Sequence, residues 1–271
     1  MWYNLLKNLL NHFSFSNNLV IQKISESYSH FNSHVNNIDI NYIVVFSVFF
    51  LFILLHYFHN MKILKQLSIL VSFFPVLVHE LGHAFAAQLT GGYIHDIRMV
   101  LTPRKQQALG SQGYALTSNK GRLSKIITIF CGYLSAPLIL ILSIYFITNN
   151  KSYIFILLSI FFMIFYFAHT KQKWLPLLLL IICLYFGYNN LISSYEIILD
   201  SMDIVYSVLV GLLLGESVQS IITTAKVTFV DHDKDWDGAL LKQYTLIPAS
   251  VWWLVWTSIS LYSVYFTIKY M

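Results

Sequence analysis

Long apolar runs separated by short polar segments dominate this chain of 271 residues. Seven runs reach, or nearly reach, the roughly 20 residues that a helix needs to cross a bilayer. They cover residues 40–58, 64–89, 123–147, 152–169, 174–188, 204–225 and 246–268. The fifth run is the shortest and is expected to pair with the fourth as a hairpin. The pattern predicts an all-α polytopic membrane protein with about six to seven transmembrane helices.

The N-terminal segment, residues 1–39, is polar and rich in Asn, Ser and His. Its apolar residues recur at helical spacing, namely Trp2, Leu5, Leu6, Leu9, Leu10 and Phe13. This spacing predicts a short amphipathic helix on the membrane surface, and a poorly ordered terminus is the alternative. No small-residue cleavage site follows a single apolar core, so a cleaved signal peptide is not expected. Residues 40–271 are expected to form one membrane-embedded domain.

Between the second and third runs, the chain is too polar to cross a membrane. Residues 93–101 and 112–117 predict two strands, joined by a loop that contains Pro103 and Gly110. Such a small β-hairpin would offer an edge to which an extended peptide can add as a further strand. A plain connecting loop is the alternative.

Composition and charge agree with a membrane location. Hydrophobic residues make up 57% of the chain and charged residues only 11%, against about 25% in soluble domains. The net charge of +5 does not predict nucleic-acid binding, because the basic residues cluster between apolar runs. Both cysteines, Cys131 and Cys183, fall in expected spans, so neither a disulfide framework nor a cysteine zinc site is expected.

The Lys and Arg residues are unevenly shared between alternate loops. With a cytoplasmic N-terminus, 13 of them fall inside, namely Lys7, Lys23, Arg98, Arg104, Lys105, Lys120, Arg122, Lys125, Lys171, Lys173, Lys226, Lys234 and Lys242. The other 4 fall outside, namely Lys62, Lys65, Lys151 and Lys269. Because basic residues favour the cytoplasmic side, we expect a multi-pass protein of the cell membrane with its N-terminus inside and its C-terminus outside.

The second apolar run contains the motif H-E-x-x-H, formed by His79, Glu80 and His83. Ionisable groups are costly in hydrocarbon and are kept there mostly for function. His79 and His83 are four residues apart, so both imidazoles leave one helix face and can bind one metal ion. Glu80 can act as a base on a water molecule beside that ion. The alternatives are an interhelical polar network and the lining of a transport path.

A catalytic zinc site usually has three protein ligands, so two imidazoles are too few. The third ligand should come from the same, cytoplasmic side of the membrane. The candidates there are His95, Asp96 and the acidic run 231–238. Within this run we prefer Asp237, because it lies nearest to the expected helix start at 238–241.

The acidic run has other interpretations. Residues 233–238 match D-x-D-x-D-G, the first half of a calcium-binding loop, but Tyr244 stands where the bidentate Glu is needed. A solvated loop is the alternative for Asp231, Asp233 and Asp235.

A further carboxyl, Glu216, lies in the sixth run just after the G-x-x-x-G pattern of Gly211 and Gly215. The glycines predict close helix packing. Glu216 either supports the metal site through its ligands or is simply a buried, hydrogen-bonded carboxyl.

These motifs resemble the site-2 protease family of intramembrane zinc metalloproteases, in its bacterial branch without PDZ inserts. The matching patches are His79–His83, Gly91-Gly92, Cys131–Pro137 and Trp236-Asp237-Gly238. The resemblance implies that His79, His83 and Asp237 bind one Zn²⁺ per chain and that Glu80 is the general base. The resemblance covers roughly residues 70–250, and we expect the metalloprotease domain to span residues 40–271. In one departure, Asp235-Trp236 replaces the Asn-Pro that often precedes the Asp-Gly of the family.

The expected function is hydrolysis of peptide bonds in membrane-associated polypeptides, as part of regulated proteolysis. The expected partners are a membrane protein or peptide substrate and the lipid bilayer, and the oligomeric state is left open. One alternative is a transporter that uses His79, Glu80 and Glu216 as a proton or metal path, although no internal repeat of the transporter type is found. The other is an inactive relative that binds membrane partners without cutting them.

Overall fold

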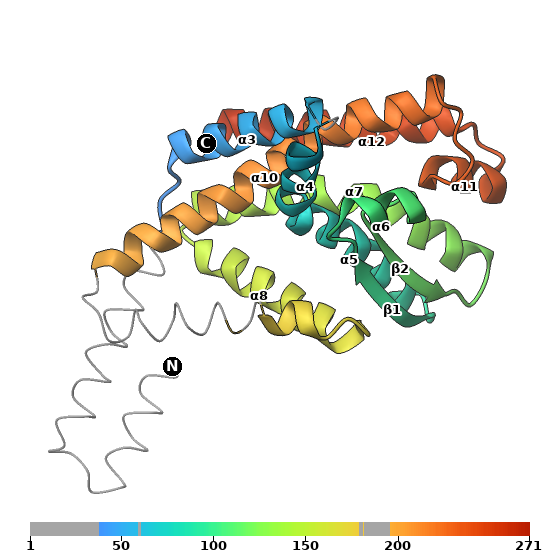
Figure 1. The fold of residues 1–271 in the computed structure, drawn as a ribbon, viewed down its shortest axis with the longest axis horizontal. Helices are drawn as coiled ribbons and strands as arrows, with labels where there is room; N and C mark the ends of the chain where they lie inside the picture. The colour runs from blue at the N-terminus through green and yellow to red at the C-terminus, as the bar shows by residue number, and fades with distance from the viewer. Residues whose placement is uncertain (1–37, 59–60, 179–180, 182–195) are drawn as a thin grey trace, which may run out of the picture.

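The structure, a computed structural model, describes residues 38–58, 61–178, 181 and 196–271. Helices make up most of this part, and one two-stranded sheet is present (Figure 1). In chain order the elements are α3 (Tyr42–Tyr57), α4 (Lys62–Val71), α5 (Phe73–Leu89), β1 (Tyr93–Met99), α6 (Pro103–Leu109), β2 (Gly113–Ser118), α7 (Arg122–Thr148), α8 (Ser152–His169), α10 (Glu196–Phe229), α11 (Asp237–Thr245) and α12 (Ala249–Tyr270). The expected N-terminal amphipathic helix and most of the expected fifth span lie outside the described residues.

Four described helices are long and apolar enough to cross a membrane. They are α7, α8, the Met202–Phe229 part of α10, and α12. The bent pair formed by α4 and α5 makes a fifth if it is one span. Helix α3 has 16 residues, which is about 24 Å against a hydrocarbon core of about 30 Å. The described part therefore supports a polytopic membrane protein with four to five spans, and the expected six to seven spans are not confirmed.

The second apolar run, expected as one span over 64–89, is two helices that meet at 51°. The bend lies at Ser72, three residues before Pro75. Proline has no N–H for the carbonyl of Val71, and its ring clashes with that carbonyl, so a straight helix cannot continue there. The hydroxyl of the buried Ser72 lies 3.0 Å from Nε2 of His56 on α3, which ties the bend to the neighbouring helix.

The expected β-hairpin is confirmed: β1 and β2 pair as antiparallel strands, with Ile97 opposite Ala115 and a register shift after Ile94. Their connection is a short helix, α6, rather than the loop expected from Pro103 and Gly110. Pro103 is the first residue of α6, where its fixed φ suits a helix and no N–H is needed. Gly110 ends α6 with φ +72°, the left-handed conformation that glycine adopts without strain.

Asp96 of β1 ties the hairpin to the end of α8. It is buried, and one carboxylate oxygen accepts a hydrogen bond of 2.6 Å from Nε of Arg98. The other accepts one of 2.8 Å from the backbone N–H of Lys171, just after α8. Since both strands also contact α5, the hairpin is held against the helix that carries the H-E-x-x-H motif (Figure 1).

Helix α5 lies in the interior and packs most extensively on α7. The largest hydrophobic cluster joins these helices through side chains such as Leu77, Leu81, Leu140 and Ile144, all of them at most 1% exposed. Because lipid is as apolar as these side chains, their close van der Waals packing, and not removal of apolar surface from water, holds the two helices together. It fixes α5, and with it the motif, inside the helix bundle.

Helix α10 packs closely on α3, which confirms the packing expected from the G-x-x-x-G pattern. A Cβ added at Gly211 would lie 2.7 Å from the carbonyl oxygen of Val45, and one at Gly215 would lie 2.7 Å from Cγ of Phe52. Only a residue without a side chain fits at either position at this helix separation.

We therefore expect Gly215→Leu to lower the free energy of unfolding by about 1–3 kcal/mol, because the added side chain would push α3 and α10 apart. The measurement is the thermal unfolding midpoint in detergent. Thr223→Leu adds apolar bulk to an exposed position of the same helix and serves as the control. Equal midpoints for the two variants would contradict close packing at Gly215.

Candidate metal centre

Helix α5 presents the two imidazoles of the H-E-x-x-H motif toward each other. The Nε2 atoms of His79 and His83 are 3.1 Å apart, and the ring planes meet at 84°. This arrangement follows from their spacing, since residues four apart lie one above the other on a helix. The helix ends at Leu89, where the sequence places its end.

The third group is Asp237, the first residue of α11. Its Oδ2 lies 3.5 Å from Nε2 of His79 and 3.3 Å from Nε2 of His83. Oδ2 is buried and accepts no hydrogen bond within the described residues. A buried carboxylate oxygen beside two imidazoles, without a donor of its own, is a position that a cation can fill.

The three donor atoms suit Zn²⁺. In a tetrahedral site with bonds of about 2.0–2.1 Å, ligand atoms are about 3.3 Å apart. The observed separations are 3.1, 3.3 and 3.5 Å. In addition, Nδ1 of His83 lies 2.7 Å from the carbonyl oxygen of Thr128, which can only accept a hydrogen bond. Nδ1 therefore carries a proton, which leaves Nε2 as the nitrogen that faces His79 and Asp237 and that can bind a metal.

Asp237 also has the charge that a ligand needs. Its burial acts to raise the pKa of the carboxyl, but the positive charge of a protonated His83, and then the interaction with His79, outweighs burial and holds this pKa below its usual range. A bound metal ion would supply positive charge in the same place. The carboxyl is therefore ionised at neutral pH. Ionised oxygen and neutral imidazole nitrogen are the forms in which these side chains bind zinc.

The imidazoles lie directly on the backbone of α7 at Gly132. A Cβ added there would overlap Cε1 and Nε2 of His83 and lie 2.9 Å from Cε1 of His79. The absent side chain at this position is what allows α7 to approach the imidazole pair. Gly132 belongs to the patch Cys131–Pro137 that carries part of the family resemblance.

Glu80 lies beside this cluster and faces the hairpin. Its side chain is buried, and its carboxyl lies close to β2. A Cβ added at Gly113 would lie 3.0 Å from Cγ of Glu80, so β2 passes close to this carboxyl. The helix spacing thus places the ligands on one face of α5 and Glu80 next to the strand.

The other ligand candidates are not brought to the imidazoles. His95 is exposed on β1, and Asp96 is engaged with Arg98 and the backbone of Lys171. His232 is exposed and lies against the end of α10 through the carbonyl of Thr228. Within the described residues, His79, His83 and Asp237 form the group suited to a metal ion.

The calcium-loop interpretation does not agree with the geometry. The carboxylate of Asp237 turns toward the imidazoles and begins α11, whereas Oδ1 of Asp233 accepts a hydrogen bond of 2.9 Å from the backbone N–H of Asp235. Asp231, Asp233 and Asp235 are exposed, in agreement with a solvated loop.

Several residues around the cluster escaped the sequence reasoning. The ring of Tyr133 lies 4.7 Å from that of His79, at 79°. Trp236 and Trp256 surround Tyr133 in turn. Tyr133 and Trp236 do fall within the resembling patches, but no periodicity marks aromatic contacts between distant helices.

Glu216 on α10 interacts electrostatically with His79, so it lies near the cluster.

The chain matches a known protein family over most of its length. The sequence model of a family described as Peptidase M50B-like matches residues 40–267. The chain belongs to this family. This confirms the resemblance to the site-2 protease family. No significant match was found among curated proteins or among solved structures. Family membership and the apolar helices together make the chain a membrane protein of a peptidase family.

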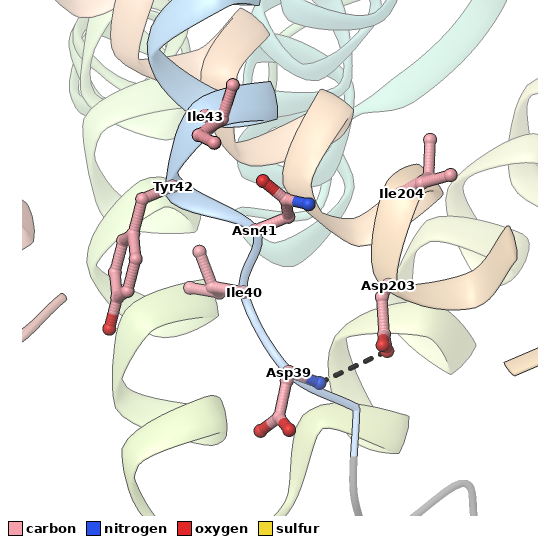
Figure 2. Close-up of a pocket in the computed structure, with 7 residues that line it drawn as sticks. All are labelled: Asp39, Ile40, Asn41, Tyr42, Ile43, Asp203 and Ile204. Atoms are coloured by element: carbon pink, nitrogen blue, oxygen red, sulfur yellow. Dashed lines mark hydrogen bonds between the residues drawn. The ribbon is translucent and has the colours of Figure 1, made fainter. Parts of the chain in front are cut away.

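A surface pocket lies elsewhere, where the segment before α3 passes the beginning of α10 (Figure 2). Its volume is about 570 Å³, and its lining residues are Asp39, Ile40, Asn41, Tyr42, Ile43, Asp203 and Ile204. The backbone N–H of Asp39 donates a hydrogen bond of 3.1 Å to the carboxylate of Asp203. No residue of the metal cluster lines this pocket.

We expect Gly132→Ala to displace the imidazoles, because its methyl group would occupy the space of His83. Zinc affinity should fall by about 10-fold or more, a size typical when the support of a ligand is lost. The measurement is zinc per chain after dialysis against a chelator. Gly121→Ala, at the N-terminus of the same helix and with nothing within 4 Å of the added atom, is the control. Equal zinc retention by both variants would contradict the packing of the imidazoles on Gly132.

Proposed function

We propose that this chain is an intramembrane zinc metalloprotease that cleaves membrane-associated polypeptides. The observation that supports this most is the meeting of His79, His83 and Asp237 within 3.1–3.5 Å, with Glu80 next to them on α5. In this proposal the first three hold the metal. Zn²⁺, when bound, lowers the pKa of a water molecule toward about 7 and polarises the peptide carbonyl.

Glu80 is proposed as the general base. Its carboxylate takes a proton from the attacking water and then gives this proton to the leaving amine, so the residue returns to its starting state. The close approach of Gly113 on β2 limits the positions that this carboxyl can take. Burial beside β2 limits exchange of the proton with bulk water.

The hairpin is proposed to present the substrate. A transmembrane helix hides its peptide bonds in internal hydrogen bonds, so a segment must unwind before it is cut. An extended segment adding to β2 would have its backbone groups paired and would pass the carboxyl of Glu80. The short distance between β2 and Glu80 supports this arrangement.

We further infer that the protein lies in the cell membrane with the metal centre toward the cytoplasm, and that it acts in regulated proteolysis. The basis for the orientation is the excess of Lys and Arg in the segments that would face inward. Its substrates would then be membrane proteins or peptides with a cleavable bond near the cytoplasmic surface.

Zinc content tests the ligand set. Detergent-purified protein should hold about one zinc per chain, and Asp237→Ala should hold much less, because two imidazoles alone form an incomplete site. Asp235→Ala removes an exposed carboxylate two residues away and should keep its zinc. Freshly prepared wild type without zinc would refute the proposed metalloprotease.

Glu80→Gln tests the catalytic role. The variant should retain zinc and lose cleavage, because the amide keeps the shape of the carboxyl but cannot take a proton. The measurement is mass spectrometry of new N-termini in membrane proteins of cells that express the wild type or the variant. Asp235→Asn is the matched control. Cleavage that persists in Glu80→Gln would remove Glu80 from the mechanism, and altered ion flux without any cleavage would favour the transport alternative.

A further inference from the structure

Trp236, the residue directly before Asp237, is only 8% exposed. Its indole packs beside both Tyr133 of α7 and Trp256 of α12, with ring centroids 6.2 and 6.0 Å away. Tyr133 and Trp256 are themselves 5.0 Å apart. The indole thus completes an aromatic cluster formed by three segments that are distant in sequence.

The indole also folds back over the backbone of Gly238. A Cβ added to Gly238 would overlap Cη2 and Cζ2 of Trp236 and lie 2.7 Å from Cζ3. Trp236, Asp237 and Gly238 therefore act as one unit. The indole points into the aromatic cluster, the glycine makes room for it, and the carboxylate between them reaches the imidazoles.

Apart from Trp236, the first turn of helix α11 packs on this cluster through Ala239 and Leu240, which are only partly buried. The helix has only 9 residues, and isolated helices of that length are marginal in water. No side chain caps its N-terminus, where the carbonyl of Trp236 accepts hydrogen bonds from Ala239 and Leu240. Farther along, Leu241 is fully buried in the same aromatic cluster. The far end is joined to α7 by a hydrogen bond of 2.7 Å from Nε of Arg122 to the carbonyl of Tyr244.

The aromatic cluster is in turn joined to α7 and to His79 on α5. Nε1 of Trp256 donates a hydrogen bond of 3.1 Å to the carbonyl of Phe130, which joins α12 to α7. The ring of Tyr133 lies 4.7 Å from His79 as well as packing near Trp236. Tyr133 thus contacts both His79, a proposed metal ligand, and Trp236, the neighbour of Asp237.

We propose that Trp236 is a positioning residue that docks the start of α11 and holds Asp237 against the imidazoles before zinc binds. This inference rests on the proposed zinc site. A carboxylate on a loosely held helix would lose its freedom only when the metal binds, and that ordering would weaken the affinity. A docked carboxylate is already ordered, so the site is preorganised.

A double-mutant cycle tests whether Trp236 acts through Asp237. The zinc dissociation constant is measured by chelator competition on the full chain in detergent, for wild type, Trp236→Ala, Asp237→Ala and the double variant. Trp236→Ala should weaken binding by about 10- to 100-fold. The double variant should bind zinc as weakly as Asp237→Ala alone, because the anchor has no effect once its carboxylate is gone.

Two controls separate positioning from general stability. Trp236→Phe keeps an aromatic ring and should stay within about 3-fold of the wild type. Trp253→Ala removes an indole of the same region that instead donates to the carbonyl of Ile221, and it should leave zinc affinity unchanged. Additive losses in the double variant, or an unchanged affinity in Trp236→Ala, would overturn the proposal.

Hydrogen exchange of the zinc-free protein gives a readout that does not depend on the metal. The amides of α11 should be protected in chelator-treated wild type and should exchange at least about 10-fold faster in Trp236→Ala. An unprotected α11 in the wild type would overturn the preorganisation. If the wild type binds no zinc, the proposed protease fails, whereas protection lost only in Trp236→Ala still supports the anchor.

Discussion

Two imidazoles and two carboxyls lie in the interior of an apolar helix bundle, and taking such groups out of water is costly unless they are paired. Here each group has partners. His83 donates a hydrogen bond to a backbone carbonyl of α7, Asp237 lies against both imidazoles, and Glu80 lies against β2. The rest of the described structure is arranged so that these partners meet. A cation at the buried oxygen of Asp237 would complete the pairing.

Three structural devices bring the groups together. Pro75 turns α5 away from α4 and into the bundle. Gly132 lets α7 approach until its backbone touches the imidazoles. Trp236 and its aromatic neighbours dock α11 against α7 and α12, so that a residue from the end of the chain reaches a helix near its beginning. The hairpin is attached separately through Asp96, which keeps β2 beside Glu80.

The family match and the geometry of the metal cluster support one another, because the first comes from the sequence and the second from distances between side chains. The family match covers most of the chain and concerns sequence alone. The distances among His79, His83 and Asp237 show that the side chains which carry the resemblance also meet in space. Together they make hydrolysis at a metal centre a more economical account than a transport path, which would not require the carboxylate of Asp237 at the imidazole pair.

The sequence by itself determined what depends on local periodicity. Apolar runs predicted α7, α8, α10 and α12, alternation predicted the hairpin, and the spacing of His79 and His83 placed both imidazoles on one helix face. Only the tertiary structure decided what depends on contacts between distant segments. It broke the second run at Ser72, brought the preferred third ligand Asp237 to the imidazoles, and gave Tyr133 and Trp236 their places beside them. Such contacts depend on how whole helices pack, and the local sequence around a residue does not predict which distant side chain it will contact.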